Sequence, residues 1–333
     1  MKMNRRAFLR MTASTITAGA LAGCMAHISS REPRVVSAKP GETMDVSAFH
    51  ASRRYAETRF GNIAYVERGT SEAAALFLHG FPLNGFQWRG ALDRLSPYRR
   101  CIAPDFLGLG YTQVAAGQSV APPAQVEMLA ALLDQLAISA VDLVANDSGG
   151  AIAQLFVTQY PQRVRTLMLT NCDVENDSPP AAVVPLIAQA RAGRFADETL
   201  LPQLMDKHLA RSAQGLGGQC YAYPDHPADE TIECYLAPLL SSAARKAQTN
   251  AYALGLDPNP LAGIEPALKR CRVPTRIVWG TSDTLFSQAS PDYLARTLPN
   301  SRGVRRVAGA KLFFPEEFPQ LIAEEAQRLW EMA

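Results

Sequence analysis

From Arg53 onward, short apolar runs alternate with helix-like segments, and this alternation is the feature that most constrains the fold. Buried strands are predicted at 73–79, 100–104, 141–145, 166–169, 275–279 and 303–307, and helices at 125–137, 150–160, 288–298 and from Pro315 onward. Such an order predicts an α/β fold with a mostly parallel, doubly wound sheet covered on both faces. Ahead of these strands, Gly61-Asn62 separates two strand-like runs and predicts a hairpin turn.

The alternation stops between residues 174 and 264. Helices are predicted there at 182–192, 199–211 and 231–247. A segment of this size between two strands of one sheet is too long for an ordinary loop. We therefore expect a core made of residues 51–173 and 265–333 with a helical cap inserted at 174–264.

The first 23 residues are typical of an export signal. Residues 1–10 carry four basic side chains and no acid, and an uncharged stretch follows that is too polar for a convincing membrane span. The run from Asn4 to Leu9 resembles the twin-arginine export motif. Leu21-Ala-Gly-Cys24 resembles a bacterial lipobox, which implies a lipid on Cys24 after cleavage. We expect an exported lipoprotein, anchored in the membrane and facing the periplasm, with residues 24–50 as a tether.

The charge balance limits the partners of the chain. Its formal net charge of +2 comes from the signal, and removal of residues 1–23 leaves a net charge of −2. Nucleic acid is therefore not an expected partner, because its recognition needs clustered cations. Membrane contact is expected through the lipid on Cys24 only. No CxxC or HxxxH spacing occurs, so neither a metal nor another cofactor is predicted, and the expected partner is a small-molecule substrate.

Five cysteines remain when Cys24 is set aside. In an oxidising compartment an odd number leaves at least one free thiol. Cys220 and Cys234 are close enough in sequence to bridge a short loop, but the sequence does not establish whether they do.

The segment from Leu143 to Gln154 predicts a strand, a sharp turn and a helix. Ala145 and Gly149 are the small residues that such a turn needs, and they place Asp147 at its apex as the nucleophile. A shifted frame would place Ser148 there, but it requires Asn146 where the turn favours a small residue. A purely structural alternative is Asp147 as the N-cap of the helix.

Four motifs in this order resemble those of the α/β-hydrolase fold family over about residues 53–330: His79-Gly-Phe-Pro82, Asp105-Phe-Leu-Gly-Leu-Gly110, the turn at Asp147, and Val278-Trp-Gly-Thr-Ser-Asp283. With an aspartate as its nucleophile, the chain resembles the branch of this family that contains haloalkane dehalogenases, fluoroacetate dehalogenases and epoxide hydrolases. The resemblance implies that Asp147 attacks saturated carbon, that the backbone N–H groups of Phe81 and Ser148 form an oxyanion hole, and that Asp283 supports the charge network. Trp88 is a candidate substrate contact, with core packing as its alternative.

The chain departs from this branch in two places. Ser148 stands where the relatives often have Trp, and Leu312 stands near the position of the general-base histidine. No histidine follows His226 in the chain. A cap histidine, His208 or His226, is therefore the candidate to replace the base, since the resemblance implies that His79 holds the oxyanion loop.

Two functions remain open from the sequence. The first is a hydrolase of the haloalkane dehalogenase or epoxide hydrolase type that acts on a small apolar substrate, or related chemistry in which Asp147 only transfers a proton. The alternative is a catalytically impaired or non-hydrolytic ligand-binding lipoprotein with the same fold.

Overall fold

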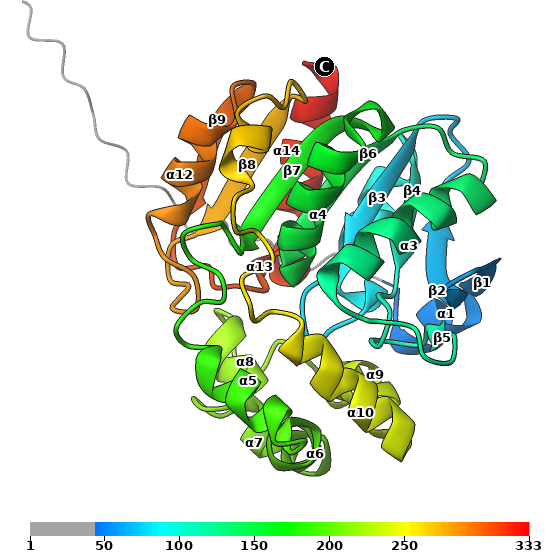
Figure 1. Ribbon diagram of the computed structural model, residues 1–333, viewed down its shortest axis with the longest axis vertical. Helices are drawn as coiled ribbons and strands as arrows, with labels where there is room; N and C mark the ends of the chain where they lie inside the picture. The colour runs from blue at the N-terminus through cyan, green and yellow to red at the C-terminus, as the bar shows by residue number, and fades with distance from the viewer. Residues whose placement is uncertain (1–43, 333) are drawn as a thin grey trace, which may run out of the picture. The chain divides into compact units, whose positions relative to one another are not determined.

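A nine-stranded sheet forms the centre of the molecule (Figure 1). The computed structural model describes residues 44–332. The strands run in the order β1-β2-β4-β3-β6-β7-β8-β9, with β5 paired to β2. Their bounds are β1 (Arg53–Thr58), β2 (Gly61–Arg68), β3 (Ala74–Leu78), β4 (Arg100–Pro104), β5 (Gln113–Val114), β6 (Val141–Asp147), β7 (Val164–Cys172), β8 (Thr275–Gly280) and β9 (Ser301–Val307).

The sheet is parallel from β4 to β9 and antiparallel at its β1–β2 edge. Strands β3 and β6 are buried along their whole length, as expected for a sheet that is covered on both faces. The α/β fold with a mostly parallel sheet is therefore confirmed.

Helices cover both faces of the sheet. In Figure 1, α3 and α4 lie in front of the sheet and α14 lies behind it; α3 packs on α4, and α2 packs on α14. Outside residues 174–264, the helices are α1 (Val46–Ala51), η1 (Gly85–Trp88), α2 (Arg89–Leu95), α3 (Pro122–Gln135), α4 (Ser148–Gln159), η2 (Pro161–Arg163), α11 (Glu265–Leu268), α12 (Ser290–Thr297), α13 (Phe314–Glu317) and α14 (Pro319–Glu331).

The long segment between β7 and β8 is helical and gathers at one end of the sheet (Figure 1). It contains α5 (Val184–Arg191), the π-helical turn η3 (Ala196–Leu200), α6 (Leu201–Met205), α7 (Lys207–Arg211), α8 (Leu216–Cys220), α9 (Asp229–Leu240) and α10 (Ala243–Leu254). Helix α10 packs against α5 and α9, so these helices form a layer of their own. We call this layer, residues 174–264, the cap.

The structure differs from the expected pattern at two places near the start of the described chain. The hairpin turn lies at Arg59-Phe60, because Thr58 pairs with Gly61 and β2 already begins at that glycine. Part of the expected tether is folded, since α1 buries Phe49 against the ring of Phe86 with centroids 5.0 Å apart. A helix of six residues is too short to show a periodic pattern.

Cys24 and the other residues of the expected signal lie outside the described residues. Within 44–332, no helix has the length and apolar character needed to cross a membrane.

Candidate active site

Asp147 lies at a strained turn where β6 ends and α4 begins. Its backbone has φ 55° and ψ −134°, and apart from Ala137 it is the one non-glycine residue among those described with a positive φ. The turn is tight, since a Cβ added at Gly149 would lie 2.5 Å from the carbonyl oxygen of His79. Asp147 occupies the N-cap position of α4, but its side chain makes no capping hydrogen bond. The strain therefore presents the carboxyl group instead of capping the helix.

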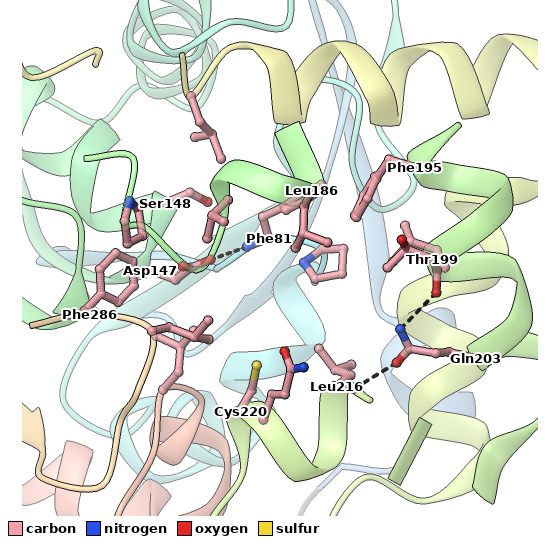
Figure 2. A pocket seen from close by; sticks show the side chains of 18 of the residues that line it. Phe81, Asp147, Ser148, Leu186, Phe195, Thr199, Gln203, Leu216, Cys220 and Phe286 are labelled. Carbon is pink, nitrogen blue, oxygen red and sulfur yellow. Dashed lines mark hydrogen bonds between the residues drawn. The ribbon is translucent and has the colours of Figure 1, made fainter. Parts of the chain in front are cut away.

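The carboxyl of Asp147 is held by the loop that follows β3. The backbone N–H of Phe81 donates to Asp147 Oδ2 over 2.6 Å (Figure 2). The N–H of Ser148 is a second donor to this carboxyl. Gly80 lets the two segments approach, because a Cβ there would lie 2.7 Å from Oδ2. Two backbone donors that converge on one carboxyl group are arranged as in an oxyanion hole.

A chain of buried side-chain amides connects this loop to the turn at Asp147. Gln87 accepts from the N–H of Gly80 over 2.9 Å and donates to Asn146 Oδ1 over 2.7 Å. Asn146 in turn donates to the carbonyl oxygen of Leu312 over 3.0 Å. Gln87 and Asn146 are fully buried, so the network fixes three loops around Asp147. Asn146, the residue that makes Ser148 unfavourable as the nucleophile in the sequence pattern, therefore holds these loops together.

Asp147 faces a mostly apolar cavity of about 150 Å³ between the core and the cap. Figure 2 shows Phe195, Thr199 and Gln203 on the side opposite Asp147, Ser148 and Phe81. A cavity of this size holds a molecule about as large as benzene. Its lining consists of Phe81, Pro82, Asp147, Ser148, Asp173, Pro180, Val183, Leu186, Phe195, Thr199, Leu200, Gln203, Gln214, Leu216, Gln219, Cys220, Leu236, Leu256, Leu285, Phe286 and Leu312.

A second carboxyl group, that of Asp173, lines the same cavity. Burial raises the pKa of Asp147 to about 7, with the negative charge of Asp173 as the next cause and the backbone donors opposing both. Burial likewise raises the pKa of Asp173 to about 7, against the hydrogen bond from Ser178 Oγ at 2.9 Å. No Lys, Arg or His belongs to this lining as the described residues form it.

The sequence interpretation missed Asp173. It lies directly after β7, and Asp147 pairs in register with Cys172, the last residue of that strand. One step along a strand and one step across the sheet separate the two aspartates, which places their Cα atoms roughly 6 Å apart. The available signal was an acidic residue at the carboxyl end of a buried strand, where active sites of parallel sheets gather.

Asp283 is buried but does not line the cavity. Its Oδ2 accepts from Asn171 Nδ2 over 2.6 Å, and its Oδ1 accepts from the N–H of Leu285 over 2.9 Å. Burial raises the pKa of Asp283, and its charge contributes to the raised pKa of Asp147. Asp283 thus affects the site through the electrostatic effect of its charge on Asp147 and through its hydrogen bond to the loop that contains Leu285.

Neither cap histidine reaches the cavity. His208 is exposed on α7, and His226 stacks on Tyr221 with its Nε2 4.0 Å from Glu316 Oε1. His79 is fully buried; its Nε2 accepts from the N–H of Phe106 over 3.2 Å, so Nδ1 carries the proton and donates to the Gly80 carbonyl over 2.8 Å. Burial lowers the pKa of His79 to about 4, which keeps its ring neutral. The expectation of a surrogate base from the cap therefore finds no support.

Leu312, which the sequence placed near the expected position of a histidine, lies in the wall of the cavity. Its side chain lines the cavity and is almost completely buried. The wall of the cavity is therefore apolar at this point.

Trp88 belongs to the core and not to the cavity. It is fully buried and packs on Phe77 with ring centroids 5.6 Å apart, so the expected substrate contact is not formed. Ser148 does line the cavity, and its Oγ lies 3.1 Å from the hydroxyl of Tyr252 on α10.

Cys220 and Cys234 are both free thiols. Cys220 lines the cavity, whereas Cys234 lies 3.6 Å from His50 Nε2. Burial raises the pKa of Cys220 well above its usual range, so this thiol is no competing nucleophile. The possible disulfide left open by the sequence is absent.

Comparison with known proteins places this site in a family. A sequence model of the alpha/beta hydrolase fold matches residues 75–318. A haloalkane dehalogenase of Mesorhizobium japonicum is 41% identical over 108 residues, 31% of this chain and 33% of the relative, so the match spans about a third of that relative's length.

Two further similarities extend over most of the chain. Haloalkane dehalogenase 2 of Mycobacterium tuberculosis is 25% identical over 307 residues, 84% of this chain and 96% of the relative. A thermophilic esterase from Thermogutta terrifontis has a structure that matches with a TM-score of 0.67 and 25% identity, covering 84% of this chain and 98% of the esterase. Relatives of different activity share this fold, so the argument for function has to come from the site.

Proposed function

The chain belongs to the alpha/beta hydrolase fold family, and from that premise we propose that it is a hydrolase in which the carboxylate of Asp147 attacks a saturated carbon of a small, neutral, apolar substrate. The single observation that carries this proposal is the position of the Asp147 carboxyl at the strained turn, held by the Phe81 N–H and facing the cavity. Attack forms an ester between Asp147 and the substrate's carbon, and water then cleaves that ester.

The lining supports the choice of substrate. Two acidic groups and no cation line the cavity as described, so a substrate with its own carboxylate would meet repulsion and no counter-charge. The apolar lining and small volume favour a short alkyl chain that carries a halide or an epoxide ring. The haloalkane dehalogenases among the relatives agree with this class of chemistry.

The oxyanion hole has a role in both steps. While Asp147 is free, the N–H of Phe81 holds its Oδ2, and the N–H of Ser148 is a second donor to the same carboxyl. When water adds to the ester, the same donors stabilise the negative charge on the carbonyl oxygen.

The test uses butyl iodide, which fits the cavity volume, and single turnover in water labelled with heavy oxygen. A covalent ester route gives butanol that carries ordinary oxygen from Asp147, while the peptide containing Asp147 gains the heavy isotope. Asp147→Asn should release no iodide. Heavy oxygen in the butanol would show instead that Asp147 only activates water.

The runner-up function is ligand binding without turnover, which the absence of a histidine from the lining favours. Its signature would be saturable binding of butyl iodide or butanol with no adduct on Asp147 and no iodide release. That result would reject the hydrolase proposal. The proposal also places the enzyme at a membrane through a lipid on Cys24, which lies outside the described residues.

A further inference from the structure

The proposed hydrolysis requires proton transfers, and no residue has yet been assigned to them. Attack on an epoxide needs an acid for the oxygen that leaves carbon, and cleavage of the ester needs a base for water. The histidines among the described residues lie outside the cavity lining. The hydroxyl of Ser148 is hydrogen-bonded to the hydroxyl of Tyr252, and burial raises the pKa of that tyrosine far above neutrality.

We propose that Asp173 is the proton-transferring catalytic residue of this site: it donates a proton to the leaving oxygen as Asp147 attacks, and it then accepts one from the water that cleaves the ester. This inference rests on the proposed function. The observations behind it are that Asp173 lines the same cavity as Asp147 and that the ends of adjacent parallel strands hold the two carboxyls.

The surroundings of Asp173 suit a group that both gives and takes a proton. It is only 3% exposed, and within residues 44–332 the side-chain hydrogen bond to its carboxyl is the 2.9 Å bond from Ser178 Oγ to Oδ1. Two carboxylates this close resist being charged together, so the pair tends to hold one proton near neutral pH. The raised pKa of Asp173, about 7 because of burial, agrees with that behaviour.

The other titratable groups around Asp173 do not supply a competing proton. Cys172 precedes it on β7, and the charge of Asp173 also acts on Tyr252 of α10. Burial raises the pKa of both groups well above neutrality. Asp177 adds a weaker negative charge from the same loop, and it is already bound to the N–H of Ser287 over 2.7 Å. Asp147 is therefore the group with which Asp173 shares its proton.

The steps balance for an epoxide. Asp147 forms a bond to a ring carbon, the carbon–oxygen bond of the ring breaks, and that oxygen takes the proton of Asp173. Water then adds to the carbonyl carbon of the ester and gives a proton to Asp173. When the bond between that carbon and the alkyl oxygen breaks, the departing oxygen takes this proton from Asp173. Asp147 is released as a carboxylic acid, so the pair of aspartates again holds one proton. The sum is epoxide plus water to diol.

An alkyl iodide needs no proton to release its leaving group, and this difference gives the test. We expect Asp173→Asn to form the butyl ester on Asp147 with butyl iodide, to release one equivalent of iodide, and then to stop. With butylene oxide the same variant should form its adduct on the order of a hundredfold more slowly than wild type, because the acid is missing. Wild type should turn over both substrates, with a bell-shaped pH profile for the epoxide.

Asp177→Asn is the matched control, because it removes a carboxylate from the same loop outside the cavity and should behave as wild type. Asp173→Glu keeps a carboxyl and should recover part of the epoxide activity, which guards against a variant that merely misfolds. Continued turnover of either substrate by Asp173→Asn at wild-type rate, with Asp147→Asn inactive, would overturn the role of Asp173 and leave the proposed function standing. Absence of both an Asp147 adduct and any released iodide or diol in all proteins would overturn the proposed function and this inference with it.

Discussion

Replacing Asp173 with Asn should change how the stability of the protein depends on pH. Burial moves the pKa of Asp173 from 3.8 to about 7 in the folded protein. A carboxyl whose pKa is raised by folding stabilises the protein at low pH, where both states are protonated. That contribution is lost as pH rises through the window from about 4 to about 7, because the unfolded chain gives up its proton first.

The size of the effect follows from the two pKa values. Each unit of difference corresponds to about 1.4 kcal/mol. Between about pH 5 and about pH 8, ionisation of Asp173 should therefore remove roughly 2–3 kcal/mol from the free energy of unfolding of wild type. Asn carries no charge and still accepts the hydrogen bond from Ser178, so the variant is spared this loss. Loss of the Asp173 charge also lowers the pKa of Asp147, which increases the difference in the same direction.

Urea denaturation at both pH values measures this effect without any substrate. The stability of Asp173→Asn relative to wild type should rise by roughly 2–3 kcal/mol from about pH 5 to about pH 8. Asp177→Asn should follow wild type within about 1 kcal/mol, because its carboxyl is less buried. A difference between Asp173→Asn and wild type that stays constant over this range would refute the argument that Asp173 ionises at a buried site.

Three further variants test separate parts of the site. Gly80→Ala places a Cβ 2.7 Å from Asp147 Oδ2, so alkylation of Asp147 should slow about a hundredfold while the far-ultraviolet circular dichroism stays unchanged. Leu312→His puts an imidazole into the cavity wall, and turnover of butyl iodide should rise on the order of tenfold or more; an unchanged rate would show that this wall is too far from the ester. Cys24→Ala should move the expressed protein from the membrane fraction to the soluble fraction with kcat unaltered, and retention in the membrane would contradict lipid anchoring.

Much of the fold follows from the sequence because buried parallel strands are continuous apolar runs. β4 begins and ends at the predicted residues, and the turn at Asp147 follows from the small residues on either side of it. The hairpin turn was predicted two residues too late, because Gly61, with a φ of 119°, is the first residue of β2 and not part of the turn.

The parts of the site that the sequence missed depend on neighbours far away in the chain. Asp173 lies close to Asp147 because β7 is adjacent to β6 in the sheet. No local sequence motif indicates this strand order. Asp283 lies where its motif predicted, but Asn171 on the neighbouring strand binds its carboxyl and holds it outside the cavity lining. Trp88 follows the oxyanion loop by only a few residues, yet η1 turns it into the core.

The buried amides of Gln87 and Asn146 have a consequence for the motions of the site. The N–H of Gly80 is covered by Gln87, which is held by Asn146, and neither side chain is exposed to solvent. Local opening of the oxyanion loop would break this whole chain of hydrogen bonds together. The Gly80 amide should therefore exchange its hydrogen with water about as slowly as the central strands do, while the amides of the cap helices exchange faster. The half of the cavity that performs the chemistry would stay rigid, and admission of the substrate would depend on motions of the cap alone.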